Sequence, residues 1–91
     1  MKADLVLHEK FRHGAGLVEL VVWQVPQPVP PSTHGFKYRL VYIVDGMRVV
    51  GYDNERSKGD HKHLRGAESA YSFVDVPTLL ADFWKDVEAA Q

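Results

Sequence analysis

The sequence contains no cysteine among its 91 residues, which excludes a disulfide framework, a thiolate metal cluster and a cysteine nucleophile. It also lacks long hydrophobic runs: the longest, such as residues 20–23, fall far short of the ~20 residues that a transmembrane helix needs. The first residues include an acidic side chain, Asp4, and no hydrophobic segment of signal-peptide length. These absences predict a cytoplasmic protein with no membrane partner.

Net charge is nearly absent too. Eleven Lys and Arg residues against twelve Asp and Glu residues give −1, which provides no global attraction to a polyanion. The distribution is uneven, however. Four basic side chains and one acidic side chain lie between Arg56 and Arg65, whereas residues 75–91 carry four acidic and one basic. A local basic cluster that also holds His61 and His63 suits a phosphate-bearing substrate.

Hydrophobic residues make up 45% of the chain, enough for the core of one domain over residues 1–91. Segments of strand-like polarity at residues 4–11 and 17–25 predict a first β-hairpin. A Gly-Ala loop would place Lys10 opposite Glu19, a favourable cross-strand charge pair. A His-Gly loop, one residue earlier, would instead pair Glu19 with a histidine.

The Asp-Gly pair at residues 45–46 has the signature of a two-residue type I′ turn between strands at residues 36–44 and 47–54. That turn fixes the register, and it predicts Tyr42 opposite Val49. On this register the open end of the hairpin carries a polar patch on one face: Lys37, Arg39, Tyr52 and Asn54.

The remaining segments predict the rest of the fold. Residues 26–31 hold four prolines and predict a stiff surface connector. Residues 53–66 are too polar for a core element and predict a long loop, which in so small a domain indicates function. Residues 71–74 suit a short closing strand. Hydrophobic residues recur with helical spacing from Val76, with Asp75 as the N-cap. Core positions are assigned to Trp23, Tyr42, Phe73, Phe83 and Trp84.

These elements together predict an α+β fold. Its antiparallel sheet has four or five strands, formed from two hairpins, and one C-terminal α-helix packs on it. The small core is compatible with a homodimer.

The His61-Lys62-His63 triplet carries the chemistry. In an extended segment, residues at i and i+2 face the same way, so both imidazoles could serve one site as general base and general acid. RNA brings its own nucleophile, the 2′-hydroxyl, so no cofactor is required and the pattern fits a ribonuclease. The candidate catalytic residues are His61, His63, Lys58 and Asp53. The candidate substrate-binding residues are Arg39, Tyr52, Asn54, Arg56, Lys62, Arg65 and Lys37.

The residues leave four alternatives open, one of which is a group-transferring enzyme that modifies RNA or nucleotides. His61 and His63 could bind a divalent metal together with Asp53 or Asp60 and form a metal-dependent nuclease. The segment could be a charged surface loop without function. The protein could also be a non-catalytic module that binds another protein through the proline segment or the acidic helix.

Tyr52-Asp53-Asn54, followed by His61-Lys62-His63, resembles a motif pair in a family of small bacterial proteins, the TumE-type toxins of type II toxin–antitoxin pairs. The resemblance extends over about residues 4–90. It implies a toxin that acts on RNA and whose partner is an antitoxin with a helix-turn-helix. Relatives carry further histidines where this chain has residues 55–60, and this departure favours the metal-free interpretation.

Overall fold

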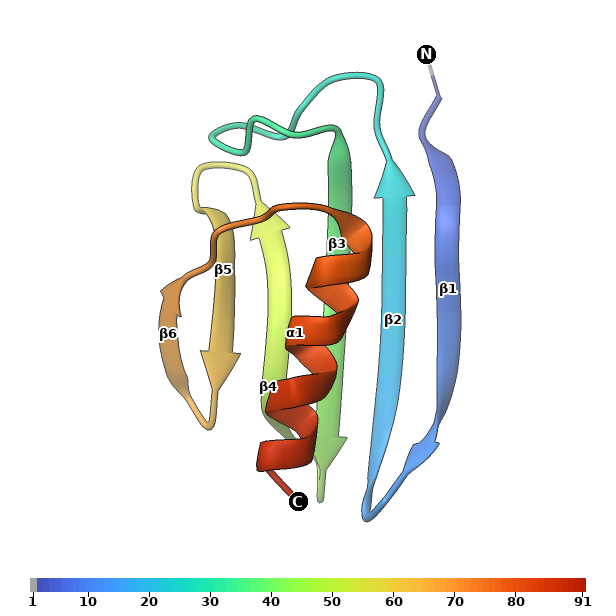
Figure 1. Ribbon diagram of the computed structural model, residues 1–91, viewed down its shortest axis with the longest axis vertical. Helices are drawn as coiled ribbons and strands as arrows, with labels where there is room; N and C mark the ends of the chain where they lie inside the picture. The colour runs from blue at the N-terminus through green and yellow to red at the C-terminus, as the bar shows by residue number, and fades with distance from the viewer. Residues whose placement is uncertain (1) are drawn as a thin grey trace.

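The strands follow one another in sequence order across one six-stranded antiparallel sheet, β1-β2-β3-β4-β5-β6, in a computed structural model that describes residues 2–91 (Figure 1). The elements are β1 (Asp4–His13), β2 (Gly16–Gln24), β3 (Phe36–Val44), β4 (Met47–Glu55), β5 (Gly59–Leu64), β6 (Ala67–Ala70) and α1 (Val76–Ala89). The predicted α+β fold with a C-terminal helix is confirmed. The predicted number of strands, four or five, was wrong, because the sheet has six.

The core lies between α1 and one face of the sheet. Every second residue of β2, β3 and β4 points toward the helix, which presents Leu79, Phe83 and Val87 at helical spacing. Fully burying such a side chain stabilises the fold by about 1.5–3 kcal/mol. The predicted N-cap is confirmed, since the Asp75 carboxylate accepts a hydrogen bond from Thr78 N at 2.8 Å. The opposite face, called the open face below, carries no helix in residues 2–91.

The first hairpin has the register predicted for a Gly-Ala loop. Lys10 lies opposite Glu19 in the β1–β2 ladder. His8 lies opposite Val21, and its Nε2 still reaches Glu19 Oε2 at 3.5 Å. The two-residue loop therefore falls at Gly-Ala.

The second hairpin has the predicted turn but a different register. Asp45 and Gly46 both have positive φ, 52° and 75°, as a type I′ turn requires. An irregularity between Tyr42 and Ile43 then shifts the pairing by one residue, so Tyr42 lies opposite Val50 and not Val49.

That one-residue shift divides the predicted polar patch between the two faces. Arg39 now lies opposite Asp53, and both side chains belong to the open face. Tyr52 and Asn54 are buried on the side where α1 packs. The prediction of one patch with Lys37, Arg39, Tyr52 and Asn54 together was therefore wrong.

The prediction of a loop over residues 53–66 was also wrong. β4 continues to Glu55, and Gly59–Leu64 forms β5, whose polar side chains find polar partners on both faces of the sheet. The closing strand is Ala67–Ala70, whereas residues 71–74 are not a strand, although Tyr71 N still donates to the carbonyl oxygen of Asp60 at 3.1 Å. No helix of residues 2–91 has the length and hydrophobicity needed to cross a lipid bilayer.

Candidate functional site

The site is centred on a carboxylate and two histidines on the open face. Asp53 of β4 lies opposite His61 of β5, and His63 follows two residues later on the same face. The two imidazole rings lie 5.1 Å apart between centroids and meet at 79°. The ligand atoms of the three residues lie within 4.8 Å of one another. The two histidines therefore lie on the same face of the sheet, as their spacing predicts.

His61 is the buried member, with 4% of its surface exposed. Its Nδ1 lies 2.9 Å from the carbonyl oxygen of Gly59. A carbonyl only accepts, so Nδ1 carries a hydrogen and donates it. Nε2 contacts Asp53 Oδ1. Both atoms are shielded from solvent, and neither makes a hydrogen bond within residues 2–91. The sheet thus holds His61 by one nitrogen and aims the other at a carboxylate.

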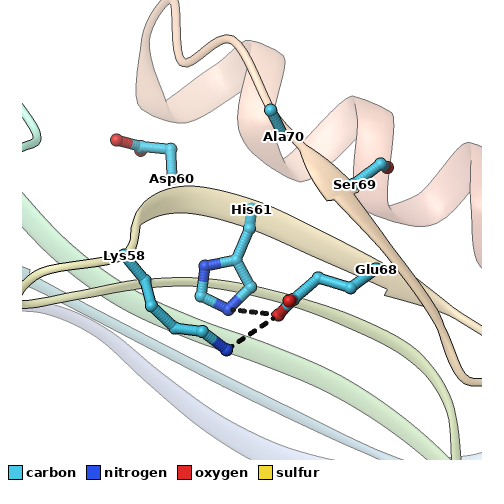
Figure 2. A pocket seen from close by; sticks show the side chains of 6 residues that line it. All are labelled: Lys58, Asp60, His61, Glu68, Ser69 and Ala70. Carbon is cyan, nitrogen blue, oxygen red and sulfur yellow. Dashed lines mark hydrogen bonds and ion pairs between the residues drawn. The ribbon is translucent and has the colours of Figure 1, made fainter.

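Glu68 of β6 joins the histidines from the neighbouring strand, where it lies opposite His63. Its Oε2 is 3.0 Å from His63 Nε2, 3.5 Å from His61 Nε2 and 3.0 Å from Lys58 Nζ. Figure 2 shows Glu68 between His61 and Lys58. The hydrogen bond from Lys58 lowers the pKa of Glu68, so this carboxyl is ionised at neutral pH. Sequence reasoning missed Glu68 because only the β5–β6 pairing brings it to His63.

His63 is more accessible than His61. Partial burial lowers its pKa, and the nearby positive charge of Arg48 lowers it further, while Glu68 acts in the opposite direction. Arg48 reaches this place by lying across Gly51, the residue opposite His63: a Cβ at Gly51 would come within 2.7 Å of Arg48 Cδ. His63 is therefore a neutral imidazole near pH 7, beside both a carboxylate and a cation.

Cations and one aromatic ring extend the open face toward β2. Arg39 lies opposite Asp53, and its Nη1 is 3.4 Å from Glu19 Oε1. Trp23 lies opposite Lys37 and is 37% exposed, so its predicted core position was wrong. Sequence reasoning missed this exposure because a tryptophan at the end of a hydrophobic strand is usually buried.

Three predicted site residues lie on the helix face and not in the site. The Tyr52 hydroxyl donates to the Asp86 carboxylate, and Lys62 Nζ lies 3.6 Å from the same carboxylate. The Asn54 side chain is fully buried, accepts from Tyr38 N and donates to a backbone carbonyl. These contacts join strands and helix.

The two remaining predicted arginines lie in turns. Arg65 has a positive φ of 48° in the β5–β6 turn, and its guanidinium donates to the carbonyl of Ala90 beyond the end of α1. Arg56 is exposed in the turn between β4 and β5. Arg56 therefore lies in the same turn as Lys58, whereas Arg65 is held at the end of α1 by its hydrogen bond.

Asp60 belongs to a second polar cluster and points away from His61, on the other side of β5 (Figure 2). It accepts hydrogen bonds from the Ser32 hydroxyl, from Tyr38 at 2.6 Å and from His34 at 2.7 Å. Burial alone would raise the pKa of Asp60, but these three hydrogen bonds outweigh it and lower the pKa. Of the two carboxylates considered beside the histidines, the structure brings only Asp53 to them.

The fold and site together define a small α+β domain with a histidine–carboxylate cluster on an open sheet face and cations around it. Residues 2–91 match the family model described as toxin TumE, so the chain belongs to the TumE toxin family. This confirms the predicted resemblance and supports a toxin role. No curated protein and no solved structure matches the chain.

Proposed function

We propose that this chain is the toxin of a bacterial type II toxin–antitoxin pair and that it acts in the cytoplasm as an endoribonuclease. Family membership supports the toxin role. The observation that carries the nuclease proposal is the accessible imidazole of His63, which lies 3.0 Å from the Glu68 carboxylate with Lys58 and Arg48 nearby. Base, charge partner and cations are the groups that RNA cleavage through the 2′-hydroxyl needs.

His63 acts as the general base in this proposal. Glu68 Oε2 lies 3.0 Å from His63 Nε2, so its negative charge stabilises the imidazolium that forms when Nδ1 takes a proton. Nδ1 takes the proton of a 2′-hydroxyl, and the 2′-oxygen forms a bond to phosphorus. The bond between phosphorus and the 5′-oxygen breaks, that oxygen takes a proton from a water molecule, and the hydroxide that results takes the proton of the His63 imidazolium. The products carry a 2′,3′-cyclic phosphate and a 5′-hydroxyl.

The basic groups have two separate tasks. Lys58 and Arg48 stabilise the negative charge that develops on the phosphoryl oxygens. Arg39, Lys37 and Trp23 hold nucleotides further along the RNA by phosphate contacts and by stacking on a base. Trp23 on β2 lies three strands across the sheet and four residues along it from His63, which at about 4.8 Å per strand and about 3.3 Å per residue amounts to about 20 Å. Trp23 can therefore meet a nucleotide several positions from the cleaved one.

His61 has a positioning task and not a catalytic one. Its Nε2 is shielded from solvent by Asp53, so a phosphodiester does not reach it. The sequence predicted that the two histidines act together as acid and base. In this proposal His63 acts as the base with Glu68 as its charge partner, and His61 holds β5 and the carboxylates of Asp53 and Glu68 in place beside His63.

The partners follow from the toxin role. A type II toxin is neutralised by a protein antitoxin, and we propose a helix-turn-helix antitoxin as the cognate partner. Homodimerisation stays a prediction.

Incubating purified protein with RNA tests the function. The wild-type protein and the His8→Gln control, which changes a histidine on β1 that contacts Glu19 and none of the residues beside His63, should both cleave, and His63→Gln should not. Equal toxicity and equal cleavage by His63→Gln would refute the assignment. Absence of cleavage in all samples, with toxicity retained, would support the non-catalytic binding alternative.

A further inference from the structure

We infer that Asp53, His61 and His63 form a binding site for a first-row transition-metal dication of the zinc type. The three residues come from two paired strands, so the sheet itself sets their spacing. Their ligand atoms already lie within 4.8 Å of one another. An ion about 2.0–2.2 Å from each ligand can therefore be accommodated through small side-chain rotations.

The hydrogen bond of His61 to Gly59 is the second observation that points to a cation. Because Nδ1 donates its hydrogen to the Gly59 carbonyl, the lone pair that can bind a cation is on Nε2. That lone pair faces Asp53 Oδ1, which is also an acceptor. Both atoms are buried and make no hydrogen bond in the described chain. Two acceptors in contact repel each other unless a proton or a metal ion lies between them.

The surroundings of His61 match those of a metal ligand. A ligating histidine usually donates its other ring N–H to a carbonyl or a carboxylate, which fixes the tautomer and the ring orientation. Gly59 supplies that carbonyl at 2.9 Å. Glu68 stands beside both histidines, at 3.0 Å and 3.5 Å, next to the position that three protein ligands leave open.

The donor set decides the class of ion. Two imidazole nitrogens and one carboxylate oxygen suit zinc and its first-row neighbours, whereas calcium and magnesium prefer oxygen ligands alone. Ion access is from the open face, on which His63 and Asp53 are partly exposed.

A bound ion would regulate the proposed function. The ion occupies the lone pair of His63 that takes the proton in the proposed cleavage, so zinc should inhibit metal-free cleavage. This consequence rests on the proposed function, whereas metal binding itself does not.

Isothermal titration of the full chain with Zn²⁺, together with the visible absorption spectrum of bound Co²⁺, tests the site. We expect one ion per chain and a higher melting temperature with Zn²⁺. Loss of a residue that only supports a metal ligand weakens metal binding by about 10- to 100-fold. Asp53→Asn and His63→Gln remove a ligand itself, so each should weaken Zn²⁺ binding by more than that. His8→Gln is the matched control, because His8 also lies on a strand beside a glutamate, and it should bind as the wild type does.

Three outcomes separate the site from the function. Absence of binding, or equal binding by all four proteins, would overturn the metal site and leave the nuclease proposal intact. If His63→Gln and Asp53→Asn lose the ion and Zn²⁺ inhibits cleavage, both proposals hold. If they lose the ion but cleavage requires Zn²⁺ and stops with EDTA, the site holds and the metal-free mechanism falls. Circular dichroism of each variant excludes unfolding as the cause.

Discussion

Asp53 and His61 lie directly opposite each other on β4 and β5, with Asp53 Oδ1 against His61 Nε2 and both atoms shielded from solvent. Two central strands thus build the middle of the site, and no mobile loop is involved. A site on paired strands keeps its geometry more closely than a site on loops. His63 and Glu68 lie beside this pair, and in the proposed function they are the groups that meet the substrate.

Replacing the cations of β3 should weaken RNA binding in a salt-dependent way. Each phosphate contact to a single strand contributes about 0.7 to the slope of log affinity against log salt concentration. Arg39→Met and Lys37→Met should each reduce that slope by about this amount, measured by fluorescence anisotropy of a labelled RNA. Lys85→Met, on the exposed side of α1, is the control and should leave the slope unchanged. If both β3 variants keep the salt dependence of the wild type, RNA does not bind at Arg39 and Lys37.

Trp23 should stack on a base. Removing such a stack costs about 1–3 kcal/mol, so Trp23→Ala should bind single-stranded RNA about 5- to 150-fold more weakly, whereas Trp23→Phe should retain most of the affinity. Trp84→Phe leaves Trp23 as the only tryptophan, and its fluorescence should be quenched when RNA binds. Fluorescence that does not respond to bound RNA would refute the stack.

Tyr52 should act on stability and not on RNA. Its hydroxyl donates to the Asp86 carboxylate, and hydrogen bonds to charged groups contribute about 1.5–3 kcal/mol. Tyr52→Phe should lower the free energy of unfolding in urea by about this amount, while RNA affinity of the folded protein stays the same. The opposite pattern, unchanged stability with weaker RNA binding, would restore Tyr52 to the substrate site.

Asp60 should make stability depend on pH. Its pKa is lower in the folded state, so its contribution is fully present above the ordinary Asp pKa of about 3.9 and is lost as pH falls through the lowered value. Asp60→Asn should therefore be less stable than wild type at pH 7, and the difference should narrow toward pH 3. Urea unfolding at several pH values measures it, with exposed Asp4→Asn as control. A difference that does not change with pH would exclude this ionisation as its source.

Signals that are local in the sequence predicted much of the fold. The Lys10–Glu19 pairing follows from the first turn, and the helix follows from its N-cap and hydrophobic spacing. The Asp-Gly turn was likewise correct. The register beyond it was not, because a bulge near Tyr42 depends on how the strands pack and has no residue signature in this turn.

The strand that carries the site could not be predicted because its polarity resembles a loop. β5 is stabilised by partners distant in sequence: Asp60 accepts from Ser32 and Tyr38, and His61 contacts Asp53. All four residues of the short edge strand β6 are exposed, which gives no periodic signal, so Glu68 was not foreseen. The two histidines were identified because their spacing alone places them on one face.

The ends of the RNA products test the central claim most directly. Wild-type protein incubated with a defined oligoribonucleotide should release 2′,3′-cyclic phosphate and 5′-hydroxyl ends, and His63→Gln should release none. A 2′-deoxy substitution at the cleaved nucleotide should abolish cleavage there, since it removes the nucleophile. Products with 5′-phosphate ends, or cleavage that persists at the deoxy position, would contradict the account.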